Sequence, residues 1–530
     1  MKLEGTLVLI GLTLKRDWLR LTIWFLSLVL VQAATALSFP GLYTNETERQ
    51  QLAETMINPA MTALVGPGYG LDNYHYGAMM GHQMLAMSAL VMAVMSILLI
   101  IRYTRTEEET GRMEIVRSLP AGALAPAASG TVVVFVLNLL IGAGTAVSLG
   151  VMGLEGQTWT GSIVYGGALA AAGIFFLGLG LLTAQLSSSA RGASGLAMGL
   201  MTLFYTVRAV GDVGGGAWSW LSPFGWIVKS EAYVSNIVWP LLLTTAASVI
   251  LLGAAGWLFN RRDIGSGVLP PREGKAEAGP LLRSPFALAL RLQRTSLIIW
   301  ALVLLLLGAM YGSILGDTDA YFADIEFMKE FMDQMAGVSM TDQFVSLLFV
   351  VLSIMATVPA LLSTTKLRAE ENNQRAEAVL TRPVSRWRLF GSYAVLTVSA
   401  TVLFTAASSA GLAGAAAAVI EDGRPFQDYF LAGIAYVPAV WVMASASALL
   451  LAVRPAFVSW IWGYVTASFV IVYMGGLFQF PAWTEKLTPY GYVPRMPVEE
   501  VELLPLILLT AVAAAVYAAA FFLYRNRDLQ

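Results

Sequence analysis

The chain has 530 residues, of which 57% are hydrophobic and only 12% are charged, whereas soluble domains carry about 25% charged residues. Its 32 basic and 34 acidic residues leave a net charge of −2, which excludes a generally basic nucleic-acid-binding surface. With no cysteine and two histidines, thiol chemistry, disulfides and a three-histidine zinc centre are excluded as well. An integral membrane protein remains.

A membrane-spanning helix needs about 20 mostly apolar residues, because lipid offers no hydrogen-bond partner to an exposed backbone. Twelve apolar runs of this kind predict an all-α polytopic membrane protein. They lie near residues 18–38, 84–103, 124–152, 159–185, 192–211, 233–259, 296–316, 343–364, 389–419, 429–453, 455–477 and 501–524.

The distribution of Lys and Arg predicts the orientation, because cytoplasmic loops are enriched in both residue types. With both termini in the cytoplasm, 25 of the 32 basic residues lie inside and seven lie outside. The opposite orientation would invert this bias. We therefore expect cytoplasmic termini.

An internal repeat organises the chain. Residues 105–120 and 368–383 match without a gap at seven of sixteen positions. The matching pairs are Arg105/Arg368, Glu107/Glu370, Glu108/Glu371, Arg112/Arg375, Glu114/Glu377, Val116/Val379 and Pro120/Pro383. Two shorter matches follow in the same order, 221–225 with 487–491 and 260–263 with 525–528. Such an ordered series indicates a duplicated unit.

Each copy contains six spans and starts inside, so the repeats are expected to be parallel, related by an axis along the membrane normal. The predicted parts are a first six-span permease unit at 1–260, a polar cytoplasmic linker at 261–285 and a second unit at 286–530. Small residues such as Gly195-x-x-x-Gly199 and the run 410–418 predict close helix approach.

The strongest match falls between the second and third spans of each unit. Glu108 and Arg112 stand at i and i+4, as do Glu371 and Arg375, in the order that favours an ion pair on a helix. We therefore predict a short surface helix in each copy, with Met113 on its apolar side. Matched helices in two copies suit a partner that is itself two-fold symmetric.

The pattern Arg-x-Glu-Glu-x-x-Gly-Arg-x-Glu, followed by Pro after the second span, resembles the coupling helix of ABC exporter permeases. The similarity is greatest to twelve-span bacterial permeases for polyketide antibiotics or multiple drugs. It implies two copies of a separate ATPase, a hydrophobic or amphiphilic substrate and the bacterial cytoplasmic membrane. It also implies these ATPase contacts: Glu107, Glu108, Gly111, Arg112, Glu114, Glu370, Glu371, Arg375 and Glu377. The second copy departs from the pattern, with Gln374 in place of the glycine.

The sequence contains no Gly-x-x-x-x-Gly-Lys-Ser/Thr loop, so it offers no recognisable cradle for nucleotide phosphates. The expectation is a transport subunit without catalytic residues, metal or cofactor of its own. ATP and Mg²⁺ would be bound by the partner ATPase.

Two other classes stay open. A proton-coupled secondary transporter also favours two parallel halves, but it needs ionisable groups at membrane depth. His75 and His82 are predicted at the outer mouth of the second span, and no Asp, Glu or His lies well inside a predicted run. A lipid-modifying membrane enzyme would need clustered acids, and the nearest candidates lie in an outer loop: Asp317, Asp319, Asp324 and Glu326.

Arg208, four residues before Asp212, is the exception inside a run, and we expect either an ion pair between the two or a role in the substrate path. In permeases of the resembled kind the first, second and fifth spans line the central route. Flexible methionines and aromatic residues suit varied hydrophobic ligands. The path residues expected on this basis are Trp24, Met84, Met87, Arg208 and Trp300.

Overall fold

All regular structure in the described part of the chain is helical. The computed structural model describes residues 3–118, 120–263, 265–269, 277, 279, 282, 284–313, 315, 340–420, 423–474, 480–499 and 501–527. Twelve helices within these residues are long and apolar enough to cross a membrane. The prediction of an all-α polytopic membrane protein is confirmed.

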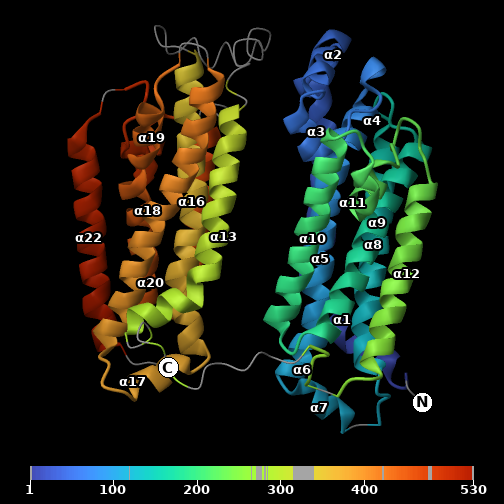
Figure 1. The fold of residues 1–530 in the computed structure, drawn as a ribbon, viewed down its shortest axis with the longest axis horizontal. Coiled ribbons are helices and arrows are strands. Elements are labelled where there is room, and N and C mark those ends of the chain that lie inside the picture. The colour runs from blue at the N-terminus through green and yellow to red at the C-terminus, as the bar shows by residue number, and fades with distance from the viewer. Residues whose placement is uncertain are drawn as a thin grey trace. The chain divides into compact units, whose positions relative to one another are not determined.

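The chain folds as two compact units, Met1–Gly274 and Lys275–Gln530, each containing a six-helix bundle (Figure 1). The spans of the first unit are α1 (Thr6–Leu42), Tyr76–Glu109 with α5 (Leu85–Ile101) at its centre, α8 (Ala125–Met152), α9 (Trp159–Leu186), α10 (Ala190–Val213) and α12 (Trp239–Phe259). Those of the second are α13 (Pro285–Ser313), α16 (Met340–Asn372), α18 (Arg386–Val419), α19 (Phe426–Ile434) continued by α20 (Val437–Val453), α21 (Trp460–Met474) and α22 (Leu503–Asn526).

The two bundles pack in the same order. In the first unit, α9 contacts α5, α8 and α12, and in the second, α20 contacts α16, α18 and α22. The first span packs on the third in both, as α1 on α8 and α13 on α18. The fourth span is therefore central: 83% of the apolar window of α9 is buried, against 22% for α1.

Small residues let neighbouring helices approach closely. A Cβ on Gly166 of α9 would lie 2.2 Å from the carbonyl oxygen of Gly142 in α8. One on Gly411 of α18 would lie 2.0 Å from that of Leu305 in α13, which confirms the close approach predicted for residues 410–418. Inside the first unit, the close approach predicted for Gly195 and Gly199 is not made, since a Cβ placed at either meets no atom of a neighbouring helix within 4 Å.

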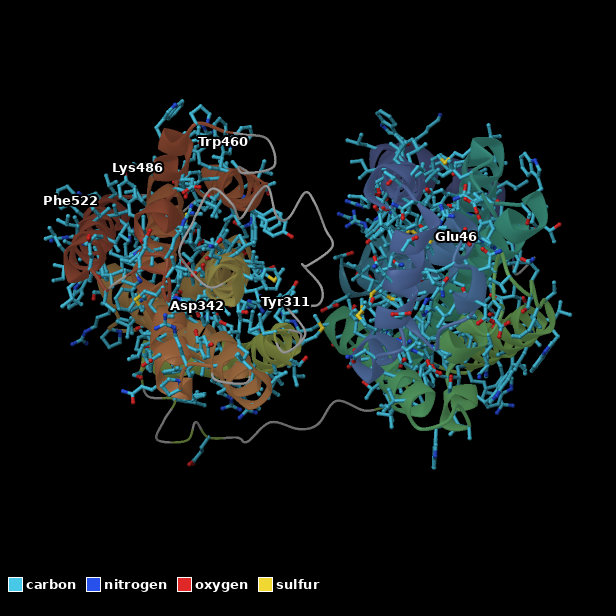
Figure 2. All side chains as sticks on the ribbon, turned by 90° about the horizontal axis from the view of Figure 1, so that it is seen from above. Glu46, Tyr311, Asp342, Trp460, Lys486 and Phe522 are labelled. Carbon is cyan, nitrogen blue, oxygen red and sulfur yellow. The ribbon has the colours of Figure 1, made fainter. Side chains whose placement is uncertain are left out.

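The peripheral helices expose large apolar side chains. Trp460 of α21 and Phe522 of α22 are 76% and 67% exposed on the outer surface of the second unit (Figure 2). In the first unit, Leu7 and Val8 of α1 and Ile250 of α12 are similarly exposed. Apolar surface on this scale is compatible with lipid and not with water.

Four predicted starts are wrong by six residues or more. The first and seventh spans begin at Thr6 and Pro285, twelve and eleven residues before the predicted starts. The second span begins at Tyr76, eight residues before the predicted start, so His82 lies inside a helix. The sixth span begins at Trp239 and not near residue 233, because the preceding residues form a turn. Three of them adopt positive φ angles that a helix cannot accommodate: Glu231, Tyr233 and Asn236.

The matches at 221–225 and 487–491 encode one local structure in the loop before the sixth span. Ser222 and Thr488 cap the short helices α11 (Pro223–Val228) and Pro489–Tyr492 through their side-chain oxygens. A Cβ on Gly225 would lie 2.0 Å from the carbonyl oxygen of Ser219, and one on Gly491 would lie 2.3 Å from that of Glu485. Both glycines thus sit against the backbone six residues earlier.

Gly225→Ala or Gly491→Ala should lower the free energy of unfolding by about 1–3 kcal/mol, because the added methyl group overlaps a backbone carbonyl that cannot move freely. Equilibrium unfolding of the detergent-solubilised protein measures this. Gly253→Ala is the matched control, since a Cβ there meets nothing within 4 Å. Equal stability of all three variants would contradict the close approach.

Candidate coupling site at the ends of the second spans

Each second span continues into a charged segment that turns back sharply. In the first unit the helix runs to Glu109, breaks at Gly111 and resumes as α7 (Arg112–Arg117). In the second, α16 ends at Asn372 and α17 (Arg375–Leu380) follows. We call residues 107–117 and 370–380 the hooks. The prediction of one continuous surface helix is wrong, because a left-handed residue divides each hook.

That left-handed residue occupies the same position in both hooks. Gly111 has φ +73° and Gln374 has φ +58°. Glycine adopts this conformation freely, whereas for other residues it costs roughly 1–2 kcal/mol. The departure noted at Gln374 therefore preserves the turn and makes the second hook energetically less favourable.

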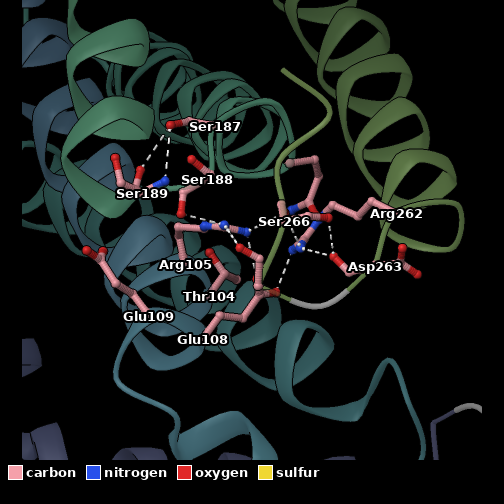
Figure 3. Close-up of polar contacts among 12 residues, drawn as sticks. Thr104, Arg105, Glu108, Glu109, Ser187, Ser188, Ser189, Arg262, Asp263 and Ser266 are labelled. Carbon is pink, nitrogen blue, oxygen red and sulfur yellow. Dashed lines mark hydrogen bonds and ion pairs between the residues drawn. The ribbon is translucent and has the colours of Figure 1, made fainter. Parts of the chain in front are cut away.

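The predicted pair between Glu108 and Arg112 is not formed. Instead Glu108, with a side chain only 2% exposed, lies between Arg105 at 2.7 Å and Arg262 at 2.5 Å (Figure 3). Arg112 faces Glu107 at 3.6 Å and remains 61% exposed. The turn at Gly111 explains why Glu108 and Arg112 do not pair, because it interrupts the helical register that i, i+4 pairing requires.

The second hook repeats this arrangement. Glu371 receives hydrogen bonds from Arg527 and Tyr524, both at 2.6 Å, while Arg375 pairs with Glu370 at 3.0 Å. The predicted pair between Glu371 and Arg375 is thus also wrong. In both units the carboxylate that the repeats share binds an arginine that follows the sixth span.

The same arginines also reach the fourth span. Arg262 donates to the side chain of Gln185 at 2.7 Å, and Arg527 donates to the carbonyl oxygen of Leu451. Each unit therefore joins the ends of its second, fourth and sixth spans through one carboxylate–arginine pair. Sequence reasoning did not assign Arg262 or Arg527 to the site, although the match between 260–263 and 525–528 contains both.

Arg105 extends the network in the first unit. Its guanidinium is 1% exposed and donates to the carbonyl oxygens of Ser188, Gly265 and Ser266 at 2.6–2.9 Å (Figure 3). Glu109 accepts a hydrogen bond from the backbone of Ala190, at the start of α10. The first hook is thereby fixed to the loop between the fourth and fifth spans.

The hooks keep an exposed outer face. Met113 and Ala376 are buried on the inner side, as the predicted apolar stripe requires. Arg112, Glu114 and Ile115 of the first hook are exposed, and so are Arg375 and Glu377 of the second. The predicted contacts fall into three groups. Glu107, Glu108, Glu370 and Glu371 make ion pairs within the protein, and Gly111 forms the turn. The accessible ones are Arg112, Glu114, Arg375 and Glu377.

The predicted path residues lie in separate places. Trp24 on α1 and Trp300 on α13 are half-buried, each against the core of its own unit. Met84 ends a π-helical turn, Met80–Met84, and Met87 follows on the same span. Their role in a substrate path stays a prediction.

Arg208 is fully buried and forms the predicted pair with Asp212, at 3.4 Å. Its guanidinium also donates to the carbonyl oxygens of Ala63 and Leu64 at 3.0 Å and lies 4.4 Å from the ring centre of Tyr205. Arg208 thus attaches the fifth span to the loop helix α3 (Pro59–Val65).

His82 is a buried ionisable group that sequence reasoning placed outside the membrane segment. Its Nδ1 lies 2.9 Å from the hydroxyl of Tyr74, and its Nε2 lies 3.3 Å from the carbonyl oxygen of Gly66. The π-helical turn around it widens the helix near its N-terminal end. The predicted second span did not include His82, because Gly81, His82 and Gln83 lower the hydropathy of the sequence there.

Comparison with known proteins places the chain in a family. Residues 282–525 match the family described as "Multidrug efflux system permease Rv1217c, C-terminal domain". The whole chain is 31% identical to the multidrug efflux system permease protein Rv1217c of Mycobacterium tuberculosis, over 99% of this chain and 95% of that protein. The chain belongs to this family of multidrug efflux permeases.

Glu108→Ala should lower the free energy of unfolding by about 3 kcal/mol, because it leaves Arg105 and Arg262 buried beside each other without a counter-charge. Glu114→Ala, on the exposed face of the same hook, should change it by less than about 0.5 kcal/mol. Equilibrium unfolding in detergent measures both. Similar values for the two variants would contradict the structural role of Glu108.

Gly111→Ala should cost about 1 kcal/mol of unfolding free energy through the left-handed backbone alone, since its Cβ would meet nothing within 4 Å. Gly195→Ala, also in open space but inside a regular helix, should be neutral or slightly stabilising. A neutral Gly111→Ala in the same unfolding measurement would show that the turn does not constrain the hook.

Proposed function

We propose that the chain is the membrane subunit of an ATP-driven exporter of hydrophobic drugs in a bacterial cytoplasmic membrane, with both termini in the cytoplasm. Two copies of a separate ABC ATPase, which bind ATP and Mg²⁺, would dock on the exposed faces of the two hooks. The observation that supports this most strongly is the repeated hook geometry. Both copies keep the left-handed turn, the carboxylate–arginine pair and an outward charged face.

The internal ion pairs connect each hook to the ends of the fourth and sixth spans. A hook that is continuous with the second span and bound to the ends of the fourth and sixth spans moves those ends together when a partner displaces it. A flexible loop would absorb the displacement instead. Buried ion pairs contribute little net stability but fix geometry, which is what transmission of movement requires.

A proton-coupled transporter is the second candidate, and His82 is the observation that favours it. The histidine is buried in a helix, and histidine is the side chain that changes charge near neutral pH. Both of its ring nitrogens are occupied by protein groups, which favours a structural role. Uptake or efflux by the purified chain alone, driven by a proton gradient, would select this candidate.

Charge reversal on the outer face tests the ATPase interface. Glu114→Arg combined with Glu377→Arg should abolish copurification of the ATPase subunit and substrate-stimulated ATP hydrolysis, because both residues face outward at matching positions. The variant permease should keep the unfolding midpoint of the unaltered protein, since neither side chain is buried.

The matched control is Arg191→Glu, an exposed charge reversal at the start of α10 outside the hooks. It should leave copurification and hydrolysis unchanged. Undiminished ATPase binding and drug transport in the Glu114/Glu377 double variant would refute the docking assignment, whatever the control shows.

A further inference from the structure

A pocket of about 180 Å³ lies in the first unit between α1, the first hook and α8. Its apolar walls include Leu9 and Leu12 of α1, Met113 and Val116 of the hook and Pro126 of α8. A pocket for a drug-sized ligand has a volume of roughly 300 Å³ or more, whereas a single water molecule needs on the order of 10–15 Å³. The volume therefore suits one large side chain, and the walls suit an apolar one.

The pocket lies beyond the basic residues that end the apolar part of α1. This helix contains 37 residues, although about 20 suffice to cross the hydrocarbon. Leu9 and Leu12 lie on the hook side of Arg16. A lipid with its phosphate on Arg16 would therefore direct its acyl chain toward the hook and away from the middle of the bundle. An apolar pocket in this place suits a protein partner.

The pocket adjoins the exposed face of the first hook. Met113 and Val116 line the pocket, while Glu114 and Ile115, which lie between them in the sequence, are exposed. Arg112 belongs to both, since it lines the pocket and its side chain is 61% exposed. A partner bound to the exposed face of the hook therefore lies against the pocket as well.

Positive charge is in excess at this pocket. Among the described residues, its lining contains Arg16, Arg112 and one carboxylate, that of Glu107. Glu107 lies 3.0 Å from Arg16 but 3.6 Å from Arg112, so it neutralises Arg112 less effectively. Charge complementarity thus favours an acidic residue of the partner beside Arg112.

We propose that this pocket receives one large apolar side chain, aromatic or long aliphatic, from the ATPase docked on the first hook, with a neighbouring carboxylate of the ATPase on Arg112. The inference rests on the proposed function and adds an anchor to it. A bulky side chain that fills a desolvated pocket is the kind of contact that dominates the affinity of an interface. The first hook is therefore the tighter of the two docking sites.

The second hook lacks the contact that joins the first hook to α1. In the first unit, Arg16 of α1 pairs with Glu107 of the hook. Among the described residues, no side chain of α13 pairs with the second hook, where Glu370 pairs with Lys366 of its own span and with Arg375. The anchor is therefore assigned to the first unit alone.

Filling the pocket tests the anchor. Val116→Phe should weaken binding of the purified ATPase at the tighter of its two sites about tenfold or more, because the added ring occupies the space that the anchor needs. Titration of the ATPase against the full-length permease in nanodiscs measures both sites. Val379→Phe adds the same group at the matching position of the second hook and should leave the tighter site within about twofold. Both variants should keep the unfolding midpoint of the unaltered protein.

Photocrosslinking tests the same contact without filling the pocket. The photoreactive residue p-benzoylphenylalanine in place of Leu12 should crosslink to the ATPase, since Leu12 lines the pocket and is 57% exposed. The matched control is the same replacement at Leu30, which is 59% exposed on the same helix but lies outside the pocket. It should not crosslink to the ATPase.

The outcomes separate the anchor from docking itself. Full affinity at both sites in Val116→Phe, while Glu114→Arg with Glu377→Arg abolishes binding, would refute the anchor and leave the proposed function intact. Equal weakening by Val116→Phe and Val379→Phe, or crosslinks from position 12 to lipid alone, would also overturn the anchor. An unaltered chain that binds no ATPase would refute the proposed function and the anchor together.

Discussion

The structure of each half depends on a carboxylate removed from water at the end of the second span. Once Glu108 or Glu371 is buried, it must have a cationic partner, because an unpaired buried charge is strongly destabilising. Arg262 and Arg527 provide that partner from beyond the sixth span, while also binding the end of the fourth. This requirement brings three distant parts of the sequence to one point and fixes where each hook leaves the bundle.

The end of the first unit that carries α3 follows a related rule. Arg208 of the fifth span is buried and binds two backbone carbonyl groups of a loop helix as well as Asp212. A charged side chain at membrane depth is costly, so it persists where several partners satisfy it. Loops at both ends of the bundle are thus attached to spans by arginines, and the apolar middle is held by small residues.

Much of the fold could be predicted from the sequence, because the length of an apolar run and the spacing of small residues can be read from a short stretch of the chain. All twelve spans were expected, and the close packing of residues 410–418 was confirmed. The site was predicted less well. A pair such as Glu108 with Arg262 joins residues 154 positions apart, and helical spacing favoured Arg112 instead. The match between 260–263 and 525–528 contains both arginines that bind the hook carboxylates. That these arginines contact residues 105–120 and 368–383 could be seen only in the three-dimensional structure.

The two halves satisfy the same turn with different residues, glycine at 111 and glutamine at 374. In a homodimer every substitution appears twice, so a residue that destabilises this turn would destabilise it in both subunits. Fusion of the copies into one polypeptide lifts that symmetry. In a single polypeptide each residue of a repeated pair can change alone, and glycine at 111 beside glutamine at 374 is such a difference.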